Sequence, residues 1–331
     1  METGTVVTET GQPVLRLDGL TIAVPGHEDA PLVDSVCLDL LPGETLGLVG
    51  ESGSGKSLTC TAALGLLPST LKVDGMIVLA GEQLTGMSPR RLREVRGTTA
   101  GMIFQEPMSS LNPVLTVRTQ LFEALRGAQY AGKTRKHQRG IELLELVGIN
   151  QPERRLGQYP HELSGGMCQR IMIAIALAGD PEILIADEPT TALDVTIQAQ
   201  VLELLKGLTS RLDMALLLVT HDLGVAAEVC DRLAVMYAGR IVEQGPVRAI
   251  LDTPTHPYTE GLLRSLPSME GPWQRLPSLP GSVPVFDDMP SGCRYHPRCP
   301  LAVERCRVEV PSLTDVASGA AAACWVRGRV A

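Results

Sequence analysis

One stretch of the sequence has the residue types and spacing of a phosphate-binding loop. Gly50 and Gly55 are followed by Lys56 and Ser57, which matches the pattern G-x-x-x-x-G-K-[ST]. Glycines let several backbone N–H groups face one anion, the lysine neutralises β- and γ-phosphate oxygens, and the serine hydroxyl can bind Mg²⁺. The residues that we expect to contact a nucleotide here are Gly50, Glu51, Ser52, Gly53, Ser54, Gly55, Lys56 and Ser57.

The flanks of this stretch have the composition that a phosphate loop requires. The apolar segment 45–49 is typical of a buried parallel strand, and residues 58–67 are mostly helix formers that end at Pro68. A strand, a loop and a helix start together place backbone N–H groups around an anion. This context favours a nucleotide site over the alternative, an ordinary glycine-rich turn.

Two adjacent carboxylates follow another apolar segment, residues 183–186. Asp187 and Glu188 would then lie at the carboxyl edge of a parallel sheet, where ligands bind in open α/β folds. Neighbouring strand residues point to opposite sides, so the two side chains can have different roles. We expect Asp187 to hold Mg²⁺ and Glu188 to polarise the attacking water. The alternative is a solvated pair at the start of a loop.

Gln105 and His221 also end apolar segments, residues 101–104 and 215–220. A single glutamine or histidine is more often structural, but both are expected at the edge that carries the phosphate loop. We therefore predict that both act on the γ-phosphate and that Gln105 joins Ser57 and Asp187 around Mg²⁺. The predicted catalytic residues are Glu188, His221 and Gln105.

A second possible anion site precedes the apolar helix that starts near Met167. Ser164 is a good N-cap residue, and Gly165 and Gly166 leave the helix N-terminus open. Because the chain already contains one phosphate loop, this segment is expected to serve the nucleotide of another copy of the fold. The pattern therefore predicts dimers that share nucleotides across their interface.

Length and composition exclude several classes of protein. The 331 residues suit one large domain with an appendage or two domains, and a net charge of −8 argues against a nucleic-acid partner. Residues 1–12 lack the features of a signal peptide, and no apolar run approaches the length of a membrane span. We expect most of the eight cysteines to be thiols or metal ligands in a reducing compartment, and Cys37, Cys60, Cys168 and Cys230 to be small core residues.

The order of the elements predicts an α/β sheet with a helical insert. Apolar segments alternate with helical patterns, and residues 116–148 have a helical period in which the basic run 133–139 is expected to be an exposed turn. After about residue 251 the composition changes, with six prolines between Pro267 and Pro290. We interpret the cysteine-containing tail, residues 291–325, as a small appended module.

Taken together, the motifs resemble those of an ABC-transporter ATPase. The phosphate loop resembles its Walker A motif, residues 104–107 its Q-loop, and residues 163–167 its signature. Residues 183–188 resemble its Walker B motif, 192–194, including Asp194, its D-loop, and 220–222 its H-loop. The resemblance implies a RecA-like P-loop fold with an antiparallel β part. It also implies a dimer in which each ATP lies between one phosphate loop and the other subunit's signature.

A closer resemblance covers nearly the whole chain. The segments FQEPMSSLNP, YPHELSGGMCQR, THPYT and SGCRYHPRCP are similar to the D-type ATPases of dipeptide/oligopeptide importers. That family implies a homologous F-type ATPase partner, two transmembrane permeases, an extracytoplasmic peptide-binding protein, and a peripheral position on the cytoplasmic face of the plasma (inner) membrane. Two positions depart from the family: Cys168 replaces an arginine, and Val24 replaces the aromatic residue that stacks on adenine.

The tail contains four further cysteines, Cys293, Cys299, Cys306 and Cys324. The spacing has neither the tight C-x2–4-C pair of structural zinc sites nor the common ferredoxin runs. It therefore indicates four thiolates, as one metal site or as unligated or disulfide-paired cysteines. Some members of the resembling family carry a 4Fe–4S cluster in this region, which favours iron–sulfur over zinc.

These observations give one preferred interpretation. Residues 1–251 are expected to form an ABC nucleotide-binding domain with a helical subdomain at about 108–165, and residues 252–331 the extension with the metal module. The resemblance implies an ATP- and Mg²⁺-dependent subunit that powers import of di- and oligopeptides. The alternatives are import of nickel or glycopeptides, a soluble ABC ATPase without a transport role, and a regulatory subunit that does not hydrolyse ATP.

Overall fold

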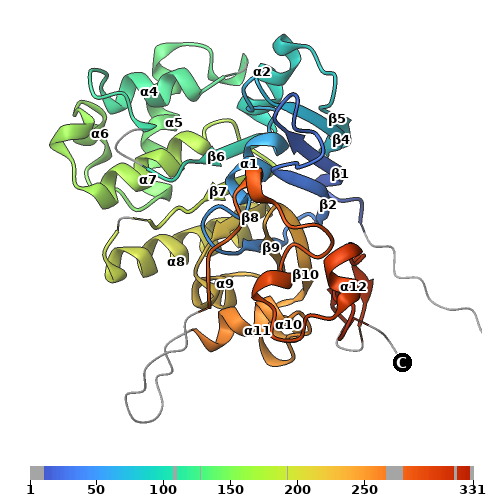
Figure 1. Ribbon diagram of the computed structural model, residues 1–331. Coiled ribbons are helices and arrows are strands. Elements are labelled where there is room, and N and C mark those ends of the chain that lie inside the picture. Colours follow the sequence, from blue (N-terminus) through green and yellow to red (C-terminus); the bar gives the residue numbers. More distant parts are fainter. Residues whose placement is uncertain are drawn as a thin grey trace, which may run out of the picture.

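The computed structural model describes residues 11–106, 110–126, 128–191, 193–265, 279–316 and 319–328. Two β-sheets organise the chain, with a group of helices beside them and the C-terminal extension at the opposite side (Figure 1). The strand before the phosphate loop, β3 (Thr45–Val49), belongs to the larger sheet, and the loop connects it to helix α1 (Lys56–Ala63).

The larger sheet has eight strands in the order β11-β12-β10-β9-β3-β8-β7-β6. The five strands from β9 to β6 are parallel, so their carboxyl ends meet at one edge. The eight strands are β3 (Thr45–Val49), β6 (Ala100–Ile103), β7 (Ile183–Asp187), β8 (Ala215–Thr220), β9 (Arg232–Tyr237), β10 (Arg240–Pro246), β11 (Thr314–Asp315) and β12 (Ala321–Ala322).

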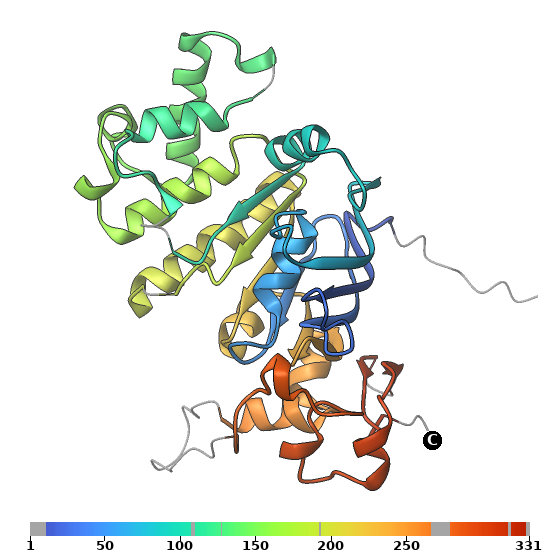
Figure 2. The same ribbon diagram turned by 45° about the horizontal axis from the view of Figure 1, so that its top comes forward.

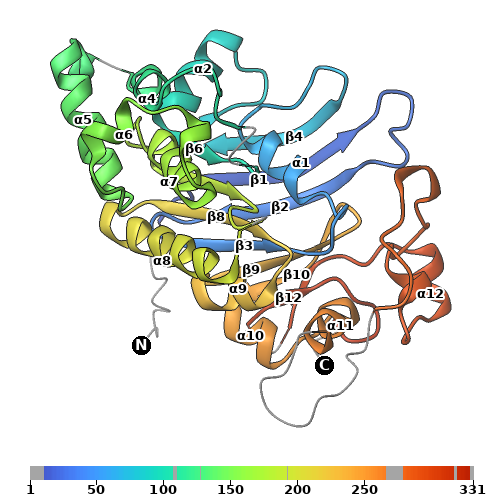
Figure 3. The same ribbon diagram turned by 90° about the vertical axis from the view of Figure 1, so that its left-hand side faces the viewer.

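The smaller sheet confirms the predicted antiparallel part. Its order is β2-β1-β4-β5, and each neighbouring pair is antiparallel. The four strands are β1 (Leu15–Ala23), β2 (Val33–Leu40), β4 (Lys72–Leu79) and β5 (Glu82–Gln83). Helix α1 (Lys56–Ala63), which starts in the phosphate loop, contacts strands of both sheets, as the turned view also shows (Figure 3).

Alternate residues of the central strands fill two different cores. Ile183 and Ile185 of β7 face the cluster between the two sheets, whereas Leu184 and Ala186 face the helices on the other side. Because both faces of the strand are covered, the whole segment is apolar, as expected for a parallel strand inside an α/β fold. The apolar run that predicted this strand is therefore explained by burial on both faces.

The helical insert lies beside the large sheet (Figure 2). One prediction for it was wrong. Residues 133–139 were predicted as an exposed turn, but they form the first half of α5 (Lys133–Leu146). Lysine and arginine are good helix formers, and Lys133 and Arg135 are exposed, while Leu143 and Leu144 bury the other face of α5. The insert contains α4 (Val117–Ala124), η1 (Ala128–Tyr130), α5, α6 (Pro152–Leu156) and η2 (Pro160–Glu162), followed by α7 (Gly165–Ala176).

The remaining helices cover the sheets or belong to the extension. They are α2 (Pro89–Thr98), α8 (Val195–Leu212), α9 (Leu223–Val229), α10 (Val247–Asp252), α11 (Pro257–Arg264), η3 (Phe286–Asp288), η4 (His296–Arg298) and α12 (Glu304–Val308). No helix among the described ranges combines the length and apolarity needed to cross a membrane.

The C-terminal extension does not stand apart as a small module in the described part of the chain. Its strand β12 pairs with β10 of the large sheet, with Ala321 opposite Gln244. Tyr258 and Tyr295 are buried against Tyr237 of β9, with ring centroids 4.7 and 5.1 Å from it. The extension thus shares a core with the sheet, which compensates for its few apolar residues. Pro267, Pro272 and Pro277 lie outside the described residues.

The scattered cysteines follow the sequence prediction only in part. Cys60 and Cys168 are buried, and Cys230 is half-buried. Cys37 was also predicted as a core residue, but it is exposed. It lies on β2, where buried and exposed positions alternate between the two faces of the strand.

Candidate functional site

The phosphate loop follows β3 and has the backbone conformation that its glycines allow. Gly50, Gly53 and Gly55 have φ angles of 156°, 81° and 103°. A Cβ atom at Gly50 would lie 2.2 Å from the carbonyl oxygen of Met236, so a side chain does not fit there. Gly55 is the N-cap residue of α1, which places the loop at a helix N-terminus, as predicted.

Lys56 lies buried inside the loop. Its Nζ donates to the carbonyl oxygens of Gly50 and Glu51, at 2.8 and 2.9 Å. Burial lowers the pKa of Lys56, and the nearby carboxylates of Glu188 and Asp187 oppose this shift. The loop therefore surrounds an ammonium group that an incoming phosphate can approach.

Asp187 and Ser57 bring two oxygen ligands together beside the loop. The hydroxyl of Ser57 donates to Oδ1 of Asp187 at 3.1 Å. Burial raises the pKa of Asp187, the hydrogen bond from Ser57 lowers it, and the charge of Glu188 raises it. A carboxylate and a hydroxyl are ligands that Mg²⁺ prefers, and a divalent cation would stabilise the ionised carboxylate. These residues fit the predicted Mg²⁺ site.

Three residues converge on one oxygen of Glu188. Its Oε2 accepts a hydrogen bond from Thr191 Oγ1 at 2.8 Å, lies 3.4 Å from Gln105 Nε2, and lies 3.3 Å from His221 Nδ1. Glu188 has a φ angle of 46°, a left-handed conformation that is uncommon outside glycine. The structure therefore brings Glu188, His221 and Gln105 together.

Thr191 is a contact of Glu188 that the sequence analysis did not find. Its backbone N–H donates to the carbonyl oxygen of Glu188 at 3.2 Å, which closes a turn after β7. Pro189 follows Glu188 directly, and proline at the second position of a turn is a local signal for this geometry. That signal predicts the turn, but it does not identify the hydroxyl as a partner of the carboxylate.

The residues of the second predicted anion site lie at helix starts. Ser164 is the N-cap residue of α7 and accepts from Met167 N at 3.4 Å, while Gly165 is exposed and Gly166 half-buried. Asp194 caps α8 in the same way, accepting from the backbone N–H groups of residues 196 and 197. The structure records no hydrogen bond between these described residues and the phosphate loop of the same chain. Residue 192 of the predicted D-loop lies outside the described residues.

Two aromatic rings lie near Val24, the position where the family carries an aromatic residue that stacks on adenine. His27 is three residues further along the chain, and Phe286 contacts the His27 ring. His27 N donates to the carbonyl oxygen of Val24 at 2.9 Å, and the His27 ring meets Phe286 edge to face at 5.8 Å. Sequence reasoning did not identify Phe286, because it comes from the extension and is brought here only by the fold.

The four tail cysteines are free thiols that influence one another. Burial raises the pKa of Cys293 to about 11, and the like charges of the other three thiols raise it as well. The backbone N–H of Cys293 donates to the carbonyl oxygen of Cys306 at 2.8 Å, which joins two of the cysteine loops. Within the described ranges, however, no group of three or more His, Cys, Asp or Glu side chains is arranged to hold a metal ion.

Comparison with known protein families and sequences identifies two regions of the chain. Residues 33–191 match the family described as ABC transporter, and residues 242–306 match the family described as oligopeptide/dipeptide transporter, C-terminal region. An oligopeptide transport ATP-binding protein of Bacillus subtilis, AppD, is 49% identical over 90% of this chain and 92% of its own length. The dipeptide transport ATP-binding protein DppD of Escherichia coli is 48% identical over 94% of this chain and 96% of its own length.

Solved structures share the fold of most of the chain. The ATP-binding cassette MJ0796, solved as a dimer bound to ADP and phosphate, has a TM-score of 0.61 and 29% identity over 71% of this chain and 99% of its own. A subunit of the cbiONQ transporter from Clostridium perfringens has a TM-score of 0.64 over 73% of this chain and 92% of its own, at 24% identity, and so supports the fold alone.

The convergence of contacts on Glu188 predicts the effect of removing its charge. Glu188→Gln keeps the shape of the side chain but removes the base, so hydrolysis of a bound nucleoside triphosphate should fall by about 10²–10⁴-fold. Nucleotide affinity should be retained, because the phosphate loop is unchanged. Single-turnover hydrolysis and equilibrium binding measure the two effects separately.

A matched control for this variant flanks the same strand at its other end. Glu182→Gln makes the same change at an exposed residue just before the amino end of β7, and it should leave both quantities unchanged. Near-normal hydrolysis by Glu188→Gln, in an assembly whose other site is inactivated, would assign the base to another residue.

The burial of Asp187 predicts opposite effects on stability and on Mg²⁺ binding. Because burial raises the pKa of Asp187, its ionisation destabilises the folded state without metal, and this destabilisation grows as the pH rises from 3.8 through the raised pKa of the folded state. Asp187→Asn should therefore keep or raise the unfolding midpoint of the nucleotide-free protein. The same variant should lose the additional stabilisation that Mg²⁺ gives in the presence of ATP.

Thermal unfolding with and without Mg²⁺ and ATP checks both statements. Asp39→Asn is the matched control, because Asp39 is an exposed carboxylate paired with Arg16. A large loss of stability in the nucleotide-free Asp187→Asn protein, or unchanged Mg²⁺-dependent stabilisation, would contradict the assignment.

Proposed function

Because the chain belongs to the ABC transporter family, among the ATP-binding proteins of oligopeptide and dipeptide transport, we propose that it powers peptide import by hydrolysing ATP. One observation carries this proposal. The ABC match at residues 33–191 and the peptide-transporter match at 242–306 occur in the same chain. A regulatory subunit without activity is disfavoured, because Lys56, Glu188 and His221 are all present and placed around one site.

ATP and Mg²⁺ bind at the carboxyl edge of the parallel strands in this proposal. Lys56 and the loop N–H groups hold the β- and γ-phosphates, while Ser57, Asp187 and Gln105 hold the metal ion. Mg²⁺ supplies positive charge that offsets the charge of the phosphates during hydrolysis. The two oxygen ligands 3.1 Å apart support this assignment.

Glu188 acts as the general base toward the attacking water. Its Oε2 accepts the proton, while Thr191, Gln105 and His221 hold the carboxylate in place from three sides. His221 and Gln105 are also the side chains that contact the γ-phosphate. His221 and Gln105 both contact Oε2 of Glu188. A phosphate oxygen that binds either side chain therefore competes with this contact and changes the position of the base.

A second ATPase subunit completes each ATP site. Ser164, Gly165, Gly166 and Met167 present a helix N-terminus, and Asp194 lies at the start of the next helix. We assign them to the ATP on the partner's phosphate loop, because Ser164, Gly165 and Asp194 are exposed. The partner is a homologous F-type ATPase in this proposal, and the solved dimer of a related cassette supports the general arrangement.

Two permease subunits dock on the face beside the helical insert. A cleft of about 330 Å³ lies there, lined by Phe104, Met102 and Arg126 among others, and Phe104 is 46% exposed. An exposed aromatic ring in a cleft suits an inserted helix from a partner. In this proposal the protein lies peripherally on the cytoplasmic face of the inner membrane, with a peptide-binding protein on the other side.

Peptides are the substrates that the comparisons favour. The similar proteins of Bacillus subtilis and Escherichia coli carry oligopeptide and dipeptide transport in their names. Nickel and glycopeptides are the alternative substrates, and a soluble ABC ATPase without a transport role is a further alternative. Residues 1–251 would form the nucleotide-binding domain and residues 252–331 the peptide-importer extension.

The four tail cysteines would hold a 4Fe–4S cluster, with zinc as the alternative. The four thiols lie close enough that charge on Cys306, Cys299 and Cys324 raises the pKa of Cys293, which supports a shared site because a bound cation would stabilise their thiolates. Their sulfur atoms must move closer together to ligate a metal. The cluster would supply structural cross-linking of the loops around η4 and α12.

The transport proposal predicts how the rate of hydrolysis depends on assembly. The isolated chain should be slow, because its signature residues serve a partner's nucleotide. Reconstitution with the partner ATPase, both permeases and a peptide-loaded binding protein should raise ATP turnover. Turnover measured in proteoliposomes with loaded and empty binding protein tests this. Fast turnover by the isolated chain, or stimulation only by nickel or glycopeptide, would contradict it.

The cluster proposal predicts the metal content of the protein. Anaerobically purified protein should be brown and contain about four iron atoms per chain. Cys299→Ser should lose the colour and the iron, whereas the control Cys37→Ser changes an exposed thiol outside the tail and should keep both. Colourless protein with one zinc ion would replace the cluster by a zinc site, and protein without metal would contradict both.

A further inference from the structure

The C-terminal extension contacts the phosphate loop directly at Glu51. Arg298 forms a bidentate ion pair with the Glu51 carboxylate, with N–O distances of 2.8 and 3.1 Å. The hydroxyl of Tyr258 accepts a hydrogen bond from the Glu51 backbone N–H at 2.9 Å. Both residues belong to the extension and lie more than 200 positions from Glu51 in the sequence.

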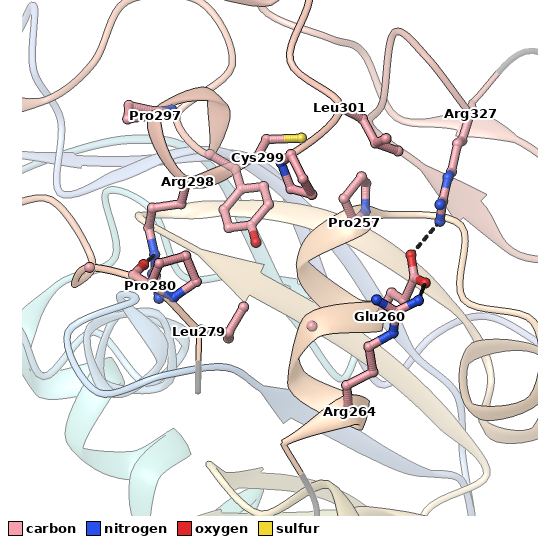
Figure 4. A pocket seen from close by; sticks show the side chains of 14 residues that line it. Pro257, Glu260, Arg264, Leu279, Pro280, Pro297, Arg298, Cys299, Leu301 and Arg327 are labelled. Carbon is pink, nitrogen blue, oxygen red and sulfur yellow. Dashed lines mark hydrogen bonds and ion pairs between the residues drawn. The ribbon is translucent and has the colours of Figure 1, made fainter. Parts of the chain in front are cut away.

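The fold holds Arg298 in place without any bound nucleotide. Its side chain is only 6% exposed, and its Nε donates to the carbonyl oxygen of Pro280 at 2.7 Å. The guanidinium lies 5.6 and 5.9 Å from the ring centroids of Tyr237 and Tyr295. Arg298 also lines a cavity of about 730 Å³ at the surface of the extension (Figure 4). The ion pair with Glu51 is therefore built from a fixed side chain.

Tyr258 is equally well fixed. Its side chain is fully buried, and its ring lies against Tyr237 and Tyr295 at 4.7 and 5.4 Å between centroids. The backbone N–H of Tyr258 donates to Nδ1 of the buried His256, at the start of α11. The hydroxyl therefore has a defined position from which it contacts the loop.

These contacts matter because Glu51 also forms hydrogen bonds with other residues of the phosphate loop. Its carbonyl oxygen accepts from Lys56 Nζ at 2.9 Å and from Ser54 N at 3.2 Å. With Tyr258 on its N–H and Arg298 on its carboxylate, every polar group of Glu51 has a partner. A glycine-rich loop loses much conformational entropy when it is ordered, and ordering it in advance favours ligand binding.

Arg298 also changes the charge that an approaching nucleotide meets. Glu51 places a carboxylate in a loop that binds a polyphosphate, and the two negative groups repel each other. The guanidinium neutralises this carboxylate through two hydrogen bonds. Without Arg298, the same loop would present an unpaired negative charge beside the phosphates.

We propose that Arg298 and Tyr258 are positioning residues of the ATP site, so that the extension completes the phosphate loop through Glu51. This role is separate from partner docking, substrate choice and metal binding by the tail cysteines, none of which requires contact with the loop. It makes the affinity for ATP depend on residues outside the nucleotide-binding part of the chain.

Substitutions at the Arg298–Glu51 ion pair separate the effect of the Arg298 charge on ATP binding from the effect of its bidentate geometry. Arg298→Gln should weaken ATP binding about tenfold, measured as the Kd of the full chain for ATP. Arg298→Lys keeps the charge but not the bidentate geometry, so its Kd should lie between those of Arg298→Gln and the parent. Adding Glu51→Gln to Arg298→Gln removes the unpaired carboxylate and should restore most of the affinity. Tyr258→Phe keeps the ring packing and should weaken binding about threefold.

Arg327→Gln is the matched control. Arg327 lines the same cavity and pairs with Glu260 at 2.6 Å, but it does not contact the phosphate loop. This variant should bind ATP as the parent does. In the assembled transporter, Arg298→Gln should raise the KM for ATP with kcat nearly unchanged, because the contact acts on binding before hydrolysis.

The measurements can overturn the proposal in two ways. If the Arg298→Gln and Tyr258→Phe proteins bind ATP as tightly as the Arg327→Gln control, these residues have no positioning role. A double variant, Glu51→Gln with Arg298→Gln, that binds no better than Arg298→Gln alone would reject the charge argument. If Arg298→Gln does not fold, the Kd values of Arg298→Lys and Tyr258→Phe decide in the same way, relative to the control.

Discussion

Parallel pairing of four neighbouring strands is the constraint on which the site depends. β3, β8, β7 and β6 lie side by side and end at one edge of the large sheet. The phosphate loop, His221, the Asp187–Glu188 pair and Gln105 follow these four strands in that order. A change in strand order would separate groups that are distant in sequence, whereas the local structure of each strand would stay the same. The chemistry of the site is therefore a property of the sheet order.

Burial of charge is the second constraint. Lys56 and Asp187 are both largely excluded from water. Burial lowers the pKa of Lys56 and raises the pKa of Asp187, so it favours the uncharged form of each. Their opposite charges partly compensate for this, whereas the charge of Glu188 stabilises protonated Lys56 but disfavours ionised Asp187. A site that contains buried ionised groups is less stable without its ligand, and a polyphosphate with its metal ion supplies the missing counter-charges. The same groups that destabilise the empty site therefore favour the occupied one.

The extension shows how a segment with few apolar residues becomes ordered. Its buried tyrosines pack on β9, and Arg294 adds polar contacts to the carbonyl oxygens of Pro31 and Ala238 and to the carboxylate of Asp34. These contacts join the extension to β2 and to the β9–β10 hairpin. The extension is therefore stabilised by the sheet that it covers, and its position brings Arg298 and Tyr258 to the phosphate loop.

The sequence by itself determined the local features of this protein. Lys56 and Ser57 were predicted from a motif of consecutive residues, and Glu188 from a carboxylate pair that ends an apolar run. Such features depend on neighbouring residues, whose spacing fixes their relative positions along a strand or loop. The helix at 133–146 was only half predicted, because its basic first half has no buried face from which a helical period could be read.

Only the tertiary structure decided which distant residues meet. Arg298 and Glu51 are 247 positions apart, and no periodicity or motif connects them. The meeting of Gln105 and His221 at Glu188 was expected from strand ends, but the shared oxygen depends on the left-handed backbone of Glu188. Contacts of this kind follow from how the sheet and the extension pack, and packing is determined by the whole chain at once.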